Sequence, residues 1–152
     1  MSENVRTCLW FDGKAEEASN LYVSLIPNSR IEHIFKPTPN GPALMVVFRL
    51  GGAPFQALNG GPQYKHSEAA SIAVSTRDQE ETDRLWDRLT ADGGSESRCG
   101  WLKDRFGVSW QIVPEALPRL LGSSDRAAAD RVMQAMLRMR KIDIAALEAA
   151  HK

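Results

Sequence analysis

The hydrophobic and polar positions of the first half of the chain follow two patterns, one typical of strands and one typical of a helix. Residues 5–11, V-R-T-C-L-W-F, form a short apolar run that predicts a β-strand. After Asp12 the apolar positions recur every three or four residues, which predicts a helix that Asp12 caps and that ends at Pro27. Three more strands are predicted at S-R-I-E-H-I-F-K, A-L-M-V-V-F-R-L and P-F-Q-A-L, the last two joined by a turn at Gly51-Gly52.

The same order of elements returns in the second half of the chain. Residues 69–75 predict a strand, and Asp78 with Glu81 three positions later predicts a helix start of the capping-box type. Residues 99–114 predict two strands separated by a D-R-F-G turn. Five positions of the first predicted helix recur 64 residues later in the second: Glu16 and Glu80, Glu17 and Glu81, Leu21 and Leu85, Tyr22 and Trp86, Leu25 and Leu89.

The strands that close the two halves also match. Aligning P-F-Q-A-L with S-W-Q-I-V pairs Phe55 with Trp110 and Gln56 with Gln111. Together with the helix frame and the strand order, this match predicts an internal duplication in which each half is a β-α-β-β-β module. The expected fold class is therefore α+β, with two βαβββ modules in one chain.

The predicted domain organisation places the paired modules in residues 1–114 and a helical C-terminal tail in residues 115–152. The modules themselves span about 5–58 and 69–113, and the linker 59–68 is rich in turn-forming Gly and Pro. In the tail, a helix is predicted from Ser124 or Asp125 to about Arg140, and a further turn or two within K-I-D-I-A-A-L-E-A-A. We expect the tail to belong to the same domain or to a homodimer interface.

Composition narrows the classes of partner. Nineteen basic residues balance nineteen acidic ones, so no general positive field attracts nucleic acid or anionic lipid. There is no apolar run of the ~20 residues that a membrane span needs. The two cysteines, and an N-terminus without the basic start and apolar run of a signal peptide, predict a cytoplasmic protein with no nucleic acid and no membrane as partner.

Three stretches carry a resemblance to a known family: W-F-D-G-K-A-E-E-A (10–18), F-Q-A-L-N-G-G-P (55–62) and C-G-W-L-K-D-R-F-G-V-S-W-Q-I-V-P (99–114). With the two βαβββ modules, they resemble the vicinal oxygen chelate superfamily of glyoxalases, bleomycin-resistance proteins and extradiol dioxygenases. Within it they resemble the PhnB-like branch, which often carries the label demethylubiquinone methyltransferase-like. The resemblance implies a glyoxalase-like cup formed by the modules, with a small-molecule ligand in it.

In that superfamily the metal ligands, where present, lie on the first and last strand of each module. The repeat alignment places these positions at Thr7, Gln56, Ser71 and Gln111, to within about a residue on the first strands. None is His, Asp or Glu, the charged or imidazole ligands that offset the dehydration of a divalent ion. We therefore expect no catalytic metal and no other cofactor, and a divalent metal is the disfavoured alternative.

Three further residues are candidates for ligand contact. Trp101 offers a ring for stacking, or it belongs to the core. Arg49 either reaches solvent or anchors an anion, and Cys99, with basic neighbours, is either a reactive thiol or a small buried side chain. Strand alternation puts Ser109, Gln111 and Val113 on one face and Val108, Trp110 and Ile112 on the helix-facing side. The two glutamines either orient a ligand or bond each other, the backbone or water.

These observations leave three hypotheses. The first is a metal-independent small-molecule binding protein, and the second is a metal-dependent lyase, isomerase or dioxygenase of the same superfamily. The third is an interaction role for the methionine-bearing tail, in which deleting residues 123–152 leaves a folded core. Methyl transfer has no support, because neither Gly51-Gly52 nor Gly60-Gly61 opens directly into a helix, as the S-adenosylmethionine loop of a Rossmann-type enzyme does.

Overall fold

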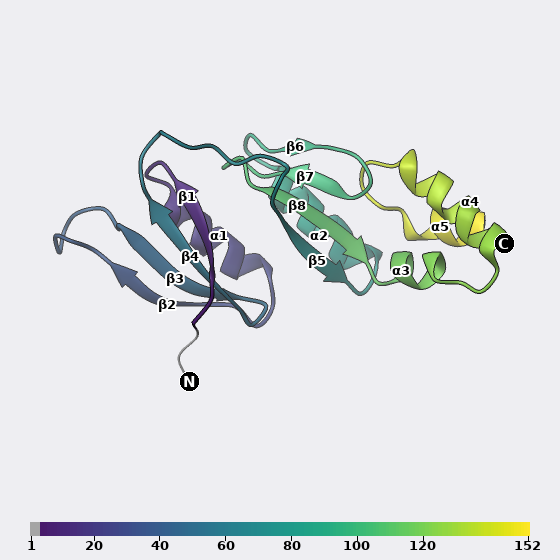
Figure 1. Ribbon diagram of the computed structural model, residues 1–152, viewed down its shortest axis with the longest axis horizontal. Coiled ribbons are helices and arrows are strands. Elements are labelled where there is room, and N and C mark those ends of the chain that lie inside the picture. The colour runs from purple at the N-terminus through teal and green to yellow at the C-terminus, as the bar shows by residue number, and fades with distance from the viewer. Residues whose placement is uncertain (1–3) are drawn as a thin grey trace. The chain divides into compact units, whose positions relative to one another are not determined.

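The computed structural model describes residues 4–152 and divides into two compact units, the first ending at His66 and the second spanning Ser67–Lys152 (Figure 1). Residues 1–3, part of the N-terminus that lacks the sequence features of a signal peptide, lie outside the described residues. Within residues 4–152, no helix combines the length and the apolar character that crossing a membrane requires.

The first unit contains one β-α-β-β-β module. Its sheet has the strand order β1-β4-β3-β2, in which β1 runs parallel to β4 and the other neighbours are antiparallel. The linker after the last strand folds back on the first, because the Trp10 indole donates a 2.8 Å hydrogen bond to the carbonyl of Gly61 and its ring meets Tyr64 edge-on. The elements are β1 (Thr7–Phe11), α1 (Ala15–Leu25), β2 (Arg30–Phe35), β3 (Met45–Leu50) and β4 (Ala53–Asn59).

The second unit repeats this order and adds the C-terminal helices. Its sheet has the order β5-β8-β7-β6, again with the first and last strands parallel (Figure 1). The α+β fold with two βαβββ modules, predicted from the 64-residue repeat, is confirmed. The elements of this module are β5 (Ser71–Thr76), α2 (Gln79–Thr90), β6 (Ser95–Glu96), β7 (Trp101–Lys103) and β8 (Ser109–Pro114).

Each sheet packs one face against the helix of its own module and leaves the other face clear of that helix, although Val113 at the end of β8 contacts the C-terminal helices from that other face. On β8 the side chains of Trp110 and Ile112 are fully buried on the helix side, as their alternation with Gln111 predicts. On β3 the buried residues are likewise every second one, Val46, Phe48 and Leu50. We call the opposite side of each sheet its helix-free face.

The two module helices begin in different ways. The cap predicted at Asp78 is confirmed, because its carboxylate accepts a 2.9 Å hydrogen bond from the Glu81 amide. The cap predicted at Asp12 is wrong. The amide of Ala15, which has no partner within the helix, instead donates a 2.9 Å hydrogen bond to the side-chain oxygen of Asn59, at the end of β4. A long-range side chain thus satisfies the helix N-terminus that a local residue was expected to cap.

The C-terminal extension, residues 115–152, is three helices around a small core of its own. Helix α4 begins after Asp125, one of the two predicted starts, whose carboxylate caps it, but it ends at Leu137 rather than near Arg140. The first of the three helices was not predicted, because Pro118 lies within it; a proline in a first turn costs little, since amides there have no helical partner. The helices are α3 (Ala116–Leu121), α4 (Arg126–Leu137) and α5 (Ile144–His151), and their buried cluster is Leu117, Leu120, Val132, Ile142 and Leu147.

The extension is bonded to the second module through its backbone. The amides of Cys99 and Gly100 donate to the carbonyls of Met139 and Arg140, at 2.9 and 2.8 Å. The Gln79 side chain both donates to the Ile142 carbonyl and accepts from the Ile144 amide, at 3.0 and 2.8 Å. The extension is therefore packed into the second unit rather than hanging from it.

Two carboxylates that hold the extension make its attachment pH-dependent. Hydrogen bonds from the Lys141 ammonium and the Gln79 amide lower the pKa of Asp83, and one from the Trp86 indole, followed by Arg140, lowers the pKa of Glu96. Because both folded-state values lie below the unfolded ones of about 4, these bonds stabilise the protein above that pH and the stabilisation is lost as the pH falls through the lowered pKa values.

We expect D83N combined with E96Q to flatten the acid limb of stability below about pH 5. Both side chains are over 40% exposed, at 42% and 43%, so the loss at pH 7 should be only about 1 kcal/mol in total. Urea unfolding at a series of pH values measures this. E80Q combined with D130N removes two exposed carboxylates elsewhere in the same unit, and an equal flattening in that control would contradict the assignment.

Candidate functional site

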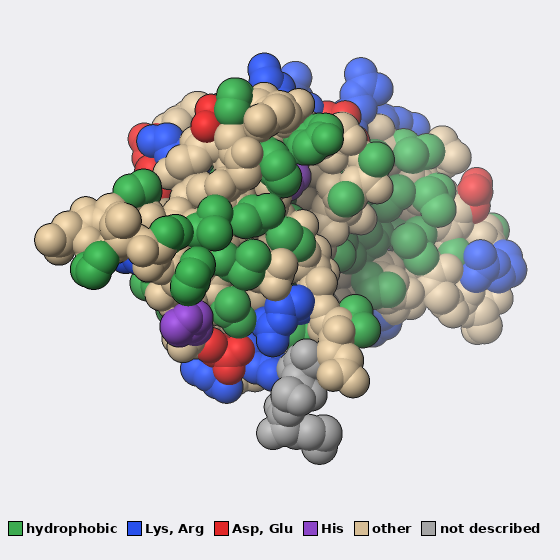
Figure 2. Space-filling view, turned by 60° about the vertical axis from the view of Figure 1, so that its left-hand side comes forward, with side chains coloured by type: hydrophobic (Ala, Val, Ile, Leu, Met, Phe, Trp, Pro, Cys, Tyr) green, Lys and Arg blue, Asp and Glu red, His purple; other side chains and the backbone are tan. Residues whose placement is uncertain are grey.

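The helix-free face of the first module carries Gln56 among apolar side chains. Figure 2 shows hydrophobic side chains at the surface, and the large exposed ones of the first unit include Phe35, Leu44 and Tyr64. Thr7 does not share this face: it pairs with Phe55, a helix-side residue, whereas Cys8 pairs with Gln56. The first-strand position expected at Thr7 therefore moves by one residue to Cys8, within the uncertainty given to it.

Arg49, on the same sheet, is engaged inside its own module. Its guanidinium donates a 2.8 Å hydrogen bond to the Gly52 carbonyl and forms a 3.5 Å ion pair with Glu32. The side chain is only 18% exposed. It is therefore not extended into solvent, one of the two roles expected for it, and its charge is already shared with a carboxylate.

The helix-free face of the second module brings together three of the predicted residues. The Gln111 amide donates a 2.9 Å hydrogen bond to the Ser71 hydroxyl, and Trp101 is the register partner of Gln111 on β7. Gln111 is thus bonded within the protein, but to the Ser71 side chain rather than to Gln56, the backbone or water, the partners expected if it did not orient a ligand. Gln56 makes no side-chain hydrogen bond to any residue in 4–152.

Cys99 does not lie on a strand, contrary to the expectation. It occupies the turn between β6 and β7 with a positive φ of 58°, a conformation unusual for a residue with a side chain. The next residue, Gly100, has no room for one, because a Cβ there would lie 2.8 Å from the Ile112 carbonyl oxygen. The two residues close the turn against the C-terminal extension, so their local geometry has a structural cause.

A pocket of about 240 Å³ opens on the helix-free face of the second module. Trp101 and Lys103 line it from β7, Ser109 from β8, and Glu68 from a turn just before β5. The Lys103 ammonium forms an ion pair with the Glu68 carboxylate, and the hydrogen bond between them lowers the pKa of Glu68. The pocket thus combines an aromatic ring, a hydroxyl and a paired cation.

Ser109 is the unusual member of this pocket. It is only 1% exposed, yet its hydroxyl finds no hydrogen-bond partner among the described residues. Its neighbours across the sheet are Ser71 on β5 and Lys103 on β7, so the hydroxyl lies in the middle of the face that the pocket occupies. A buried hydroxyl without a partner costs about 1–3 kcal/mol, which a bound polar group would remove.

Sequence reasoning found only part of this group. It identified Trp101 as a ring that could stack on a ligand. It also identified the face of β8 on which Ser109 lies, because side chains alternate along a strand and Ser109 is two residues from Gln111. It did not identify Lys103 as a pocket residue, although the pairing Lys103 to Ser109 follows from the hairpin turn. No pattern in the sequence indicated Glu68, because its place depends on how the linker enters β5.

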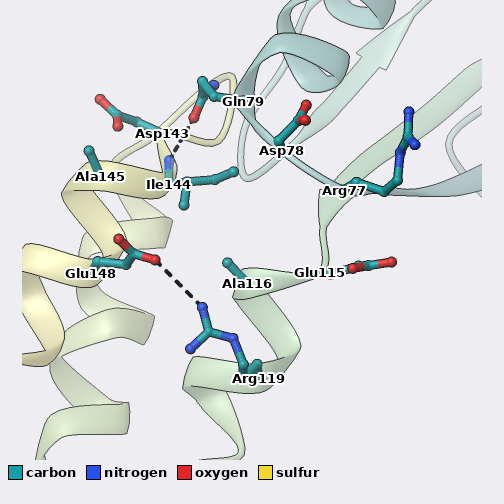
Figure 3. Close-up of a pocket in the computed structure, with 10 residues that line it drawn as sticks. All are labelled: Arg77, Asp78, Gln79, Glu115, Ala116, Arg119, Asp143, Ile144, Ala145 and Glu148. Atoms are coloured by element: carbon teal, nitrogen blue, oxygen red, sulfur yellow. Dashed lines mark hydrogen bonds and ion pairs between the residues drawn. The ribbon is translucent and has the colours of Figure 1, made fainter.

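A larger pocket, of about 460 Å³, lies where the starts of α2, α3 and α5 meet (Figure 3). Most of its charged groups already have partners. The carboxylates of Asp78 and Asp143 cap α2 and α5, and Arg119 forms a 3.5 Å ion pair with Glu148. This pocket is therefore better explained as the junction between the module and the extension than as a site awaiting a ligand.

The residues at the superfamily's metal positions do not fit a divalent ion. Corrected for register, the first module offers the thiol of Cys8 and the amide of Gln56, and the second offers the hydroxyl of Ser71 and the amide of Gln111. This donor set has no carboxylate or imidazole, and Gln111 already uses its amide on Ser71. Among residues 4–152, no three His, Cys, Asp or Glu side chains lie together as a potential metal site.

The frame that holds S-adenosylmethionine in a Rossmann-type methyltransferase is also missing from the described chain. Gly51 and Gly52 turn β3 into β4, and Gly60 follows β4, so neither glycine pair leads from a strand into a helix. A Cβ at Gly60 would lie 2.3 Å from the Trp10 ring, so this glycine is needed for the linker to pack. The residues present do not fit that cofactor in that frame.

Comparison with known proteins agrees with the fold. The family model described as 3-demethylubiquinone-9 3-methyltransferase matches residues 3–113. The PhnB protein from Bacillus cereus is 31% identical, with a TM-score of 0.67 over 74% of this chain and 99% of its own. Protein PA1353 from Pseudomonas aeruginosa is 23% identical, with a TM-score of 0.60 over 75% and 98%. No curated protein matches the sequence.

A more distant structure shares the fold alone. The fosfomycin resistance protein FosX from Listeria monocytogenes, solved with Mn(II) and sulfate, is 13% identical with a TM-score of 0.52 over 75% of this chain and 90% of its own. The family match ends at residue 113, before α3, so the C-terminal extension lies outside it. From the match over both modules, the chain belongs to the PhnB-like family described as 3-demethylubiquinone-9 3-methyltransferase.

Proposed function

We propose that this protein binds a small molecule on the helix-free face of its second module and does so without a catalytic metal. The observation that carries the proposal is Ser109, a hydroxyl buried to 1% exposure, unpartnered and lining a pocket. Buried polar groups in proteins are nearly always hydrogen-bonded, so an exception inside a pocket is best explained by a partner that comes and goes. The neutral donor set at the metal positions supports binding rather than Lewis-acid catalysis.

Binding is also favoured over methyl transfer, because the described residues offer no frame for the methyl donor. Neither the glycine-containing turns nor the 240 Å³ pocket offers a frame for S-adenosylmethionine. The family's description therefore names a relationship, and the residues of this chain support a simpler role. We also expect a homodimer, with a cytoplasmic location.

The cost of the unpartnered hydroxyl gives a direct test. S109A should raise the stability of the ligand-free protein by about 1 kcal/mol, because it removes a buried polar group that has no bond. S71A, on the neighbouring strand, should lower it by about 1 kcal/mol, because the Gln111 amide loses its acceptor. Urea unfolding of the two variants measures both, and a destabilised S109A would contradict the idea that this hydroxyl lacks a partner.

The function itself is tested by looking for the ligand. Native mass spectrometry of protein purified without chelator reads the subunit count, any metal and any co-purified molecule together. A thermal-shift screen of small metabolites then asks what stabilises the wild type but not S109A. Metal at one equivalent per subunit would overturn the proposal, as would the absence of both a co-purified compound and any stabilising one.

A further inference from the structure

We propose that the pocket on β7 and β8 takes a single aromatic ring bearing one carboxylate, and that Glu68 occupies the place of that carboxylate when no ligand is bound. The inference rests on the proposed function and names the ligand class for the same pocket. Three groups of the pocket support it: the ring of Trp101, the ammonium of Lys103 and the turn that carries Glu68.

The size of the pocket limits the ligand. At about 240 Å³ it is below the ~300–1,000 Å³ typical of sites for drug-sized molecules. One wall is the indole of Trp101, which is half-buried and whose N–H makes no hydrogen bond to residues 4–152. A flat ring of one cycle fits both the volume and the stacking geometry that an indole offers.

The charge of the pocket sets the second feature. Lys103 is 41% exposed, and its only ion-pair partner among the described residues is Glu68. Glu96 also lines the pocket, but its carboxylate accepts a 2.7 Å bond from the Trp86 indole and pairs with Arg140, so it is committed to the module and its extension. The cation of Lys103 is therefore the group available to a ligand anion, provided that Glu68 releases it.

Glu68 is placed so that it can release the ammonium. It is 61% exposed and lies in a turn outside any helix or strand, held by bonds from Ala69 and Ala70 to Ser67. An exposed ion pair of this kind contributes little to stability, so exchanging one carboxylate for another at Lys103 costs little. Glu68 then acts as an internal competitor that lowers the apparent affinity for the ligand.

Calorimetric titration with benzoate tests this directly. We expect wild-type protein to bind benzoate, E68Q to bind it about 3–10-fold more tightly, and K103M, W101L or S109A to bind it at least 10-fold more weakly. Cyclohexanecarboxylate, which keeps the charge without the aromatic ring, and benzyl alcohol, which keeps the ring without the charge, should each bind at least 10-fold more weakly than benzoate.

The matched control is E80Q, which removes an exposed carboxylate from α2 in the same unit, away from the pocket. Affinity unchanged in E68Q, or raised equally in E80Q, overturns the role of Glu68. Equal binding of benzoate and cyclohexanecarboxylate overturns the aromatic class. If benzoate fails to bind while the metabolite screen finds another ligand dependent on Ser109, this inference fails and the proposed function stands; if neither binds, both fail.

Discussion

Replacing Asp104 by alanine is expected to cost about 3–5 kcal/mol and to leave the second module close to unfolding at 37 °C. Asp104 is 2% exposed, and its carboxylate accepts hydrogen bonds from at least three donors. Two come from the amides of Phe106 and Val108 and fix the turn between β7 and β8, and the third comes from the indole of the fully buried Trp110. Alanine leaves that indole N–H buried without an acceptor.

Two further variants serve as comparisons: D104N removes the charge of Asp104 but keeps a side chain of similar size, and D12A removes an exposed carboxylate elsewhere. D104N keeps one oxygen for the turn amides but cannot serve all three donors, so we expect about half the loss of D104A. D12A should change stability by less than about 0.5 kcal/mol, because Asp12 is exposed and caps no helix. Urea unfolding followed by tryptophan fluorescence measures all three. A D104A protein as stable as D12A would mean that the turn does not need its buried carboxylate.

The sequence predicted those features that local rules determine. The 64-residue repeat revealed the duplication because the helix core positions, such as Leu25 and Leu89, must recur when the same module is built twice. The side of the sheet on which Trp110 lies followed from alternation alone, and the cap at Asp78 from its spacing to Glu81. Each of these depends on residues within one element or one repeat.

The features that were missed depend on contacts between segments distant in the chain. The amide of Ala15 is capped from β4 by Asn59, and no local pattern indicates that. The exchange of Thr7 for Cys8 on the helix-free face is a one-residue register effect, which alignment of short strands does not resolve. The approach of Glu68 to Lys103 depends on a turn whose direction only the folded unit determines.

Deleting residues 123–152 is expected to destabilise the second unit so far that it no longer shows a cooperative unfolding transition. The deletion exposes Leu117 and Leu120 of α3, and it removes the carbonyls that accept from the amides of Cys99 and Gly100. The loss is on the order of 5 kcal/mol, which is most of the ~5–15 kcal/mol that stabilises a typical domain. The earlier expectation that this deletion leaves a folded core, made for a tail that binds a partner, is therefore unfavourable on energetic grounds.

Hydrogen exchange read by mass spectrometry tests the deletion one module at a time. Amides of β8 should lose most of their protection while amides of β3 and β4 serve as the internal reference. M133Q combined with L137Q is the matched control, because these side chains are 38% and 49% exposed on α4 and their change leaves the buried cluster intact. Full protection of β8 after the deletion would show that the module folds alone. If the wild type co-purified with a protein partner and the M133Q/L137Q variant did not, while β8 stayed protected, an interaction role for the outer face of α4 would be restored. In that case only the surface of α4 would have changed.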